Sequence, residues 1–164
     1  MTTIPDPLYS NIIRNIPIPC VDICVVHEGR ILLVKRGDKP AQGSWWLPGG
    51  RVHKGEKMAY TAKRKALEEV GLDCVVGPLV HTAETIFPDG PWGISVHSIN
   101  SCFLLYPKLG ESTGLNVTLD SHHEDYRWVD AIDRSLHPYV KDCLRACGLA
   151  GAEQEETDVS DKGT

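Results

Sequence analysis

The chain has 164 residues and a formal net charge of −5, with 41% hydrophobic and 24% charged residues. This composition is typical of a single globular domain with its own core. It argues against duplex nucleic acid as a partner, because phosphate backbones are bound by clustered Lys and Arg. It also argues against a membrane span, because no apolar run approaches the ~20 residues that cross a bilayer.

The N-terminal third predicts a helix and a β-hairpin. Four prolines bracket residues 8–16, which suit one short amphipathic helix. β-Branched and apolar residues predict strands over 21–26 and 31–35, joined by a turn at Glu28-Gly29. A polar loop follows over 36–46, and Pro48-Gly49-Gly50 has the composition of a sharp turn.

The next segment, residues 58–70, is the best helix candidate. It contains neither Gly nor Pro, and Gly71 follows it as a left-handed cap. Its apolar face is predicted from residues that recur at helical spacing. These are Ala59, Ala62, Ala66 and Val70.

The C-terminal half predicts strands over 74–80, 95–106 and 125–129, then a helix over 131–147. Gly77-Pro78 interrupts the first strand, and Pro138 is a point of interruption in the helix. Cys143 and Cys147 lie four residues apart on that helix, as two small core residues on one face. The order of elements predicts an α/β layered domain.

The net charge is concentrated at the end of the chain. Residues 151–164 hold five acidic side chains and one basic one, which accounts for −4 of the −5. We therefore expect one domain over residues 1–150, with 1–19 as an N-terminal extension, and a disordered acidic tail over 151–164. No secretory signal is visible and no CxxC pair occurs among the six cysteines, so we expect a cytoplasmic protein with reduced thiols.

Residues 50–72 carry the clearest chemical pattern. Glu56 stands near the start of the predicted helix, and Arg64, Glu68 and Glu69 lie near its end. Carboxylates beside a glycine turn suit a hard cation such as Mg²⁺, which bridges carboxylates to substrate phosphates. The alternative for such spacing alone is a solvated helix face with an Arg64–Glu68 ion pair.

The complete segment, GRVHKGEKMAYTAKRKALEEVGL, resembles the Nudix box, the signature of hydrolases that act on nucleoside diphosphates linked to another group. The resemblance implies an α/β/α sandwich with a mixed sheet, in which the box forms a loop–helix–loop. It also implies a divalent cation at the helix, usually Mg²⁺ and alternatively Mn²⁺.

One position departs from that pattern. Where the family has Glu after the box arginine, this chain has Lys65, on the same helical face as Glu69. If the Lys65 ammonium lies ~4 Å from the Glu69 carboxylate, the two charges interact by roughly 4 kcal/mol at an effective dielectric of ~20. A lysine cannot replace a carboxylate ligand, so Lys65 argues against the ordinary cleavage of the P–O–P bridge and favours either a different chemistry or an inactive homologue.

Beyond the box, the chain is similar to GDP-mannose mannosyl hydrolases, a Nudix branch that cuts the sugar carbon–oxygen bond and also lacks the Glu that Lys65 replaces. The similarity covers roughly residues 8–130. It is carried by residues 8–23, 35–36, 40–52, His97 and 122–128. It implies metal-dependent hydrolysis of a nucleotide sugar to GDP and a free hexose, by a homodimer joined through the N-terminal segment.

The resemblance gives several residues catalytic roles. His123 matches the general base, a task that suits histidine because its pKa lies near neutrality. Arg36 and Arg51 match arginines that contact the diphosphate, whose oxygens suit the guanidinium fork. Asp22 matches a residue that assists near the sugar, and a charge inside an apolar strand needs a partner.

The expected metal ligands are the carbonyl of Gly49 and the carboxylate of Glu69, with Glu68 ranked lower. His122 falls where the branch has a side-chain amide ligand, and imidazole suits Mn²⁺ better than Mg²⁺. Glu56 is expected to orient the box loop through Arg64.

Tyr9 and His97 complete the expected substrate-binding set, Tyr9 by stacking on a base or sugar. Two other functions stay open on the sequence alone. A Nudix diphosphatase would cleave the P–O–P bridge with Glu56, Glu68 and Glu69. A catalytically silent nucleotide-binding homologue would agree with Lys65, but the combination of His123 with two arginines argues against it.

Overall fold

Seven strands form one mixed sheet in the computed structural model, which describes residues 4–108 and 115–151. The elements in chain order are α1 (Asp6–Asn15), β1 (Ile18–His27), β2 (Arg30–Arg36), β3 (Trp45–Trp46), β4 (Gly49–Arg51), α2 (Met58–Val70), β5 (Cys74–Phe87), η1 (Pro91–Gly93), β6 (Val96–Pro107), β7 (His123–Val129) and α3 (Pro138–Ala146). The strand order is β3-β2-β1-β6-β5, with β4 paired to β1 and β7 paired to β2. Of the predicted acidic tail, all but Gly151 lies outside the described residues.

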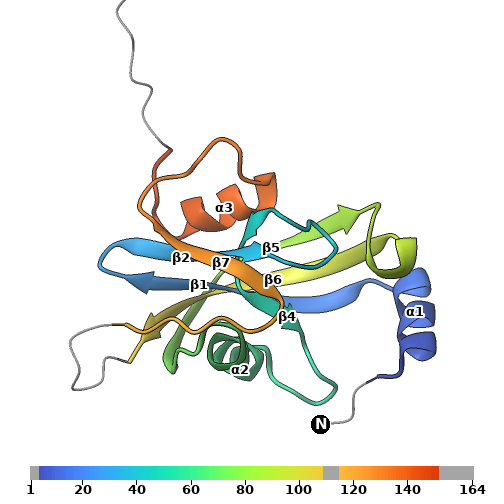
Figure 1. Ribbon diagram of the computed structural model, residues 1–164. Coiled ribbons are helices and arrows are strands. Elements are labelled where there is room, and N and C mark those ends of the chain that lie inside the picture. The colour runs from blue at the N-terminus through green and yellow to red at the C-terminus, as the bar shows by residue number, and fades with distance from the viewer. Residues whose placement is uncertain (1–3, 109–114, 152–164) are drawn as a thin grey trace, which may run out of the picture.

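The predicted hairpin is confirmed as β1 and β2, which pair Val26 with Ile31 across the turn. Both strands are largely buried on both faces, which explains why they read as continuous apolar runs. Alternate residues point to opposite sides, so Ile23 packs in the core with α2 and Cys24 packs in the core with α3. Figure 1 shows α2 below the sheet and α3 above it, which confirms the expected α/β/α sandwich.

Helix α2 has the predicted bounds, and Gly71 ends it in the left-handed conformation with φ 71°. Ala62, Ala66 and Val70 are fully buried against the sheet. Ala59 is exposed, so the apolar face begins one turn later than the spacing predicted.

Two predicted elements have different bounds. Strand β5 continues through Gly77-Pro78 because the pairing with β6 shifts register between Val76 and Leu79, and a bulge on an edge strand tolerates proline. The helix predicted over 131–147 is shorter and begins at Pro138, which suits the first helical position because it needs no donor there. The side chain of His137 caps it by accepting from the Tyr139 N–H.

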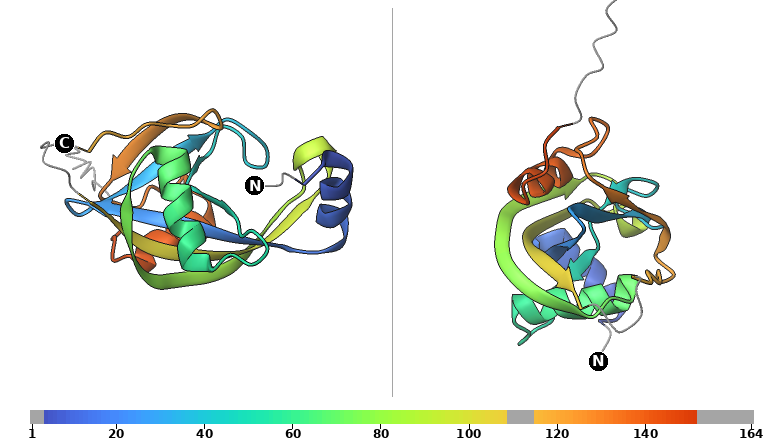
Figure 2. Two further views of the ribbon diagram at one scale, coloured as in Figure 1. Left: turned by 90° about the horizontal axis from the view of Figure 1, so that it is seen from below. Right: turned by 90° about the vertical axis from the view of Figure 1, so that its left-hand side faces the viewer.

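Helix α1 and η1 lie together at one end of the molecule, away from α2 and α3 (Figure 2). They share a small cluster built on Ile13, Ile18 and Ile94. The six cysteines are all free thiols. Within the described part of the chain, no helix combines the length and apolar character that a bilayer crossing demands.

Candidate functional site

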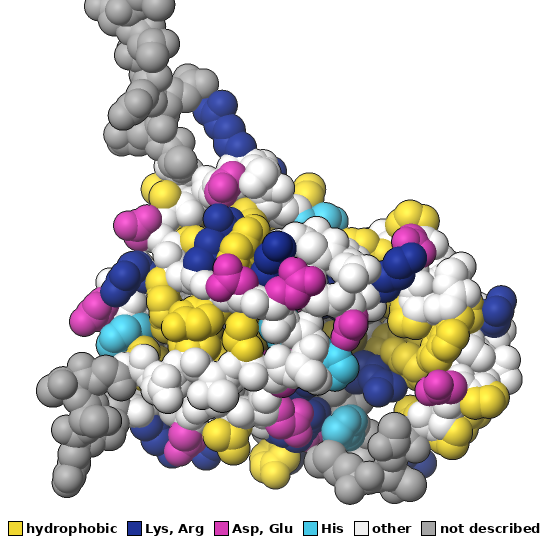
Figure 3. All heavy atoms as spheres, in the orientation of Figure 1, with side chains coloured by type: hydrophobic (Ala, Val, Ile, Leu, Met, Phe, Trp, Pro, Cys, Tyr) yellow, Lys and Arg dark blue, Asp and Glu magenta, His cyan; other side chains and the backbone are white. Residues whose placement is uncertain are grey.

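A cavity of about 410 Å³ lies where the α1 end meets the body of the sheet. In the space-filling view a hollow appears there, with histidine and basic side chains beside apolar ones (Figure 3). Eight of the ten residues singled out from the sequence line this cavity. They are Tyr9, Asp22, Arg36, Gly49, Arg51, Glu69, His122 and His123. Residues far apart in the chain are thus gathered by α1, β1, β2, β4, α2, the start of β7 and the loop before it.

The other two residues lie outside the lining. Val96 and Ser98 of β6 face the cavity, so the alternation of a strand places His97 on the opposite face. The carboxylate of Glu68 accepts a hydrogen bond of 2.9 Å from Arg64 instead, and its side chain is 47% exposed. The structure therefore does not bring His97 and Glu68 together with the other eight residues.

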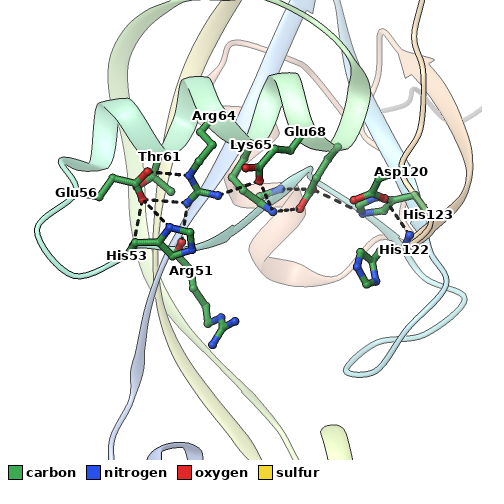
Figure 4. Close-up of polar contacts among 12 residues, drawn as sticks. Arg51, His53, Glu56, Thr61, Arg64, Lys65, Glu68, Asp120, His122 and His123 are labelled. Atoms are coloured by element: carbon green, nitrogen blue, oxygen red, sulfur yellow. Dashed lines mark hydrogen bonds and ion pairs between the residues drawn. The ribbon is translucent and has the colours of Figure 1, made fainter. Parts of the chain in front are cut away.

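His123 is held by a carboxylate. Its Nδ1 lies 2.8 Å from Oδ1 of Asp120, and only 7% of its side chain is exposed (Figure 4). This pairing favours the tautomer with the proton on Nδ1, which leaves Nε2 able to accept a proton. Nε2 lies 3.8 Å from Oε2 of Glu69. The sequence analysis missed Asp120, and the available signal was a carboxylate three residues before the candidate base.

Asp22 is buried in β1, with 6% of its surface exposed. Burial raises the pKa of its carboxyl to about 7, although the hydroxyl of Tyr139 donates a hydrogen bond of 2.7 Å to it and Arg36 lies nearby. Tyr139 is the partner that a charge in this strand required. No local spacing could have identified it, because it lies on α3, 117 positions later in the chain.

Two arginines face the cavity from β2 and β4. Arg36 donates a hydrogen bond of 2.7 Å to the Pro40 carbonyl, and burial lowers its pKa while Asp22 and Glu69 oppose that change. The guanidinium of Arg51 lies 4.2 Å from the ring centre of Tyr9, at cation–π distance. Guanidinium groups placed in this way suit the oxygens of a diphosphate.

Arg64 of α2 holds the loop between β4 and α2, which contains Glu56, against the helix. Its Nε and Nη2 donate to the two oxygens of Glu56 at 2.7 and 2.9 Å, and Nη2 also reaches the Arg51 carbonyl at 3.2 Å (Figure 4). The hydrogen bonds from Arg64 are the main reason why the pKa of Glu56 falls to about 2. Glu56 therefore orients the loop through Arg64, as expected from the sequence.

The carboxylate of Glu69 has partners on both oxygens. The ammonium of Lys65 lies 2.6 Å from Oε1, and the Gly49 N–H donates to Oε2 at 2.9 Å. Lys65 is thus turned inward, onto the residue expected to bind a metal.

His122, another expected metal ligand, is also engaged. Nδ1 of His122 lies 2.5 Å from a carboxylate oxygen of Asp38, which raises the pKa of the imidazole. Across residues 4–108 and 115–151, no group of three or more His, Cys, Asp or Glu side chains is arranged to hold a metal ion. As these side chains lie, the expected ligand set does not fit a divalent cation.

Comparisons with known proteins agree with this fold. The family model of the NUDIX domain matches residues 17–142. The low-salt glycan biosynthesis protein Agl8 of Haloferax volcanii is 33% identical over 152 residues, covering 88% of this chain and 91% of that protein. The RNA pyrophosphohydrolase of Wolbachia pipientis subsp. Culex pipiens is 29% identical over 139 residues, covering 77% and 84%. The crystal structure of the MutT NUDIX hydrolase from Burkholderia pseudomallei gives a TM-score of 0.67 at 24% identity, covering 80% of this chain and 98% of that one.

Proposed function

This chain belongs to the Nudix family, whose domain model matches more than half of it, and we propose that it hydrolyses a GDP-sugar at the anomeric carbon. The products would be GDP and a free hexose. The observation that carries the proposal is one cavity lined by the Asp120-held His123 together with Arg36 and Arg51. The similarity to a protein named for glycan biosynthesis supports a sugar-linked substrate.

In the proposed reaction, water attacks the anomeric carbon on the face opposite GDP, and Nε2 of His123 accepts its proton. The carbon–oxygen bond breaks, and its electron pair leaves with the β-phosphate. Arg36 and Arg51 stabilise the negative charge that develops there through charge-assisted hydrogen bonds. The ring of Tyr9, which already packs on Arg51, supplies a face for the guanine base.

Nudix hydrolases generally use divalent metal ions such as Mg²⁺. Lys65 holds the carboxylate of Glu69, so the proposed reaction gives no task to a metal. The resemblance implies dependence on Mg²⁺ or Mn²⁺, and activity with each ion and with EDTA tests that expectation. A homodimer formed through residues 1–19 is the remaining part of the proposal, and light scattering of the purified protein tests it.

The decisive experiment follows GDP-mannose by phosphorus NMR in water enriched in the heavy oxygen isotope, with Mg²⁺, with Mn²⁺ and with EDTA. We expect GDP whose phosphates carry no label, because the oxygen of water goes to mannose. GMP with mannose 1-phosphate, and label on a phosphate, would contradict the proposal. Bound GDP without turnover of any nucleotide sugar would indicate a silent binding module.

Cleavage of the P–O–P bridge is the second candidate function. The similarity to an RNA pyrophosphohydrolase favours it, as does the presence of adjacent carboxylates at Glu68 and Glu69. Against it stand the contacts of those carboxylates, which go to Arg64 and Lys65. The position of the isotope label separates the two reactions in a single measurement.

A further inference from the structure

The side chain of Lys65 lies between α2, which carries it, and Gly50 of β4. Its Nζ lies 2.6 Å from Oε1 of Glu69 and 3.6 Å from Oε2 of Glu68, and 17% of its side chain is exposed. Its stem rests on Gly50, where an added Cβ would come within 2.6 Å of Lys65 Cε. The ammonium therefore lies beside Glu69 and is largely withdrawn from solvent. Figure 4 shows the side chain of Lys65 projecting from α2.

Glu69 needs a positive partner, because only 8% of its side chain is exposed and a buried carboxylate is costly without one. Within the described part of the chain, its ion-pair partners are Lys65 at 2.6 Å and His123 at 3.8 Å. Lys65 carries a permanent charge at neutral pH, whereas the imidazole of His123 is charged only when protonated. Lys65 thus provides the neutralisation that a bound cation would otherwise supply.

A divalent cation at Glu69 would have to displace the Lys65 ammonium or bind next to it against charge repulsion. Displacement would also require the stem of Lys65 to leave its packing on Gly50. Both routes weaken cation binding at this carboxylate.

The remaining charges on the cavity wall favour an anion. Asp38 and Asp120 each hold a histidine, and Lys65 neutralises Glu69. Lys39 also lines the cavity, but its ammonium pairs with Asp89 at 2.7 Å. The guanidinium groups of Arg36 and Arg51 then remain as lining cations for a ligand. They match a diphosphate in charge and in fork geometry.

We propose that Lys65 replaces the divalent cation as the counter-ion of Glu69, so that the cavity binds the diphosphate of a nucleotide sugar without a divalent metal. The choice of ligand rests on the proposed function. The replacement itself is a property of the site that can be measured without any nucleotide.

The first experiment measures Mn²⁺ binding to the nucleotide-free protein by electron paramagnetic resonance. We expect Lys65→Glu to bind Mn²⁺ at least about tenfold more tightly than the natural protein, because it exchanges a repelling charge for an oxygen ligand. Lys63→Glu is the matched control, since it makes the same charge change two positions earlier, where Lys63 pairs with exposed Asp73. Equal Mn²⁺ affinity in Lys65→Glu, Lys63→Glu and the natural protein would overturn the proposal.

The second experiment measures GDP binding by calorimetry in EDTA and in Mn²⁺. We expect the natural protein to bind GDP within about threefold of the same affinity in both. Lys65→Met keeps the stem on Gly50 but loses the charge, and should bind GDP at least about tenfold more weakly in EDTA and recover in Mn²⁺. Lys65→Arg, which keeps the charge, should resemble the natural protein.

A natural protein that binds GDP only with Mn²⁺ would overturn metal-free binding, as would unchanged GDP affinity of Lys65→Met in EDTA. Failure to bind GDP under every condition would overturn the proposed function, and the Mn²⁺ measurement would still decide the role of Lys65. Far-ultraviolet circular dichroism shows whether each variant has kept its fold.

Discussion

The hydroxyl of Tyr139 donates a hydrogen bond of 2.7 Å to Asp22, and its ring stacks on Trp46 with a centroid distance of 5.8 Å. Asp22 lines the cavity, but α3, which carries Tyr139, contributes no side chain to the described lining. Asp22 lies two positions before Cys24 and therefore points to the face of the sheet that α3 covers. Helix α3 thus fixes a side chain of the site without itself lining the cavity.

Replacing Tyr139 by Phe tests this link. The ring and its stacking on Trp46 remain, but the buried carboxyl of Asp22 loses a donor, which we expect to cost about 1–3 kcal/mol of unfolding free energy. Urea denaturation measures the loss. Tyr106→Phe, at a position that is 46% exposed, is the control and should change stability by less than about 0.5 kcal/mol. An equal loss in both variants would contradict the role given to the hydrogen bond.

Asp22 should also make stability depend on pH. Its pKa is about 7 in the folded chain, against an ordinary value of 3.8, so the folded state binds the proton more tightly. The contribution of this group is complete below about pH 4 and is lost as the pH rises through about 7. The unfolding free energy of the natural protein should therefore fall relative to that of Asp22→Asn across this range. Parallel curves for the two proteins would show that Asp22 does not titrate in this way.

Glu56 should behave in the opposite sense. Its pKa is lowered to about 2 by the hydrogen bonds from Arg64, so its contribution is present above the ordinary value of 4.5 and is lost as the pH falls through about 2. Glu56→Gln should lose about 1–3 kcal/mol at neutral pH, because the guanidinium of Arg64 loses one of its two carboxylate partners and keeps only the more exposed Glu68. Thermal unfolding between neutral and acidic pH should show the difference shrinking with acid. Glu84→Gln, at an exposed position, serves as the control and should follow the natural protein throughout.

His123→Gln tests the proposed base. We expect turnover of GDP-mannose to fall by roughly 10²-fold or more, while GDP affinity stays similar, because the imidazole acts on the attacking water and not on the diphosphate. Asp120→Asn should cause a smaller loss of turnover, since it disturbs only the orientation of the ring. His27→Gln, a histidine that packs on Trp128 away from the cavity, should leave turnover unchanged. A rate near that of the natural protein for His123→Gln would remove this residue from the mechanism.

Local features of the fold were predictable from the sequence. The bounds of α2 and its cap at Gly71 follow from helix propensity and from the left-handed conformation that glycine accepts. The length of β5 was not predictable, because Gly77-Pro78 is tolerated only through a register shift with β6. The start of α3 at Pro138 reflects the same limit, since a proline can either interrupt a helix or begin one.

Some contacts of the site could be predicted from the sequence, and others could not. The Asp120–His123 pair joins residues three positions apart and could be found by inspecting the loop. The face of β6 that lines the cavity depends on strand parity and register, so the exclusion of His97 required the structure. The inward turn of Lys65 also required it, because a long side chain on a helix can point either to solvent or to a buried carboxylate.

Tyr9, which lines the cavity, packs against the cluster of Ile13, Ile18 and Ile94. This cluster shares no residue with the two larger cores. A segment with so few buried contacts opens at a lower free energy than the central sheet. A ligand that bridges Arg51 and Tyr9 stabilises only the closed form of this segment, so occupancy of the cavity and local unfolding of α1 are thermodynamically linked. The protection of the α1 amides against hydrogen exchange should therefore increase with ligand occupancy. The free energy needed to close α1 over the cavity also lowers the observed affinity for such a ligand.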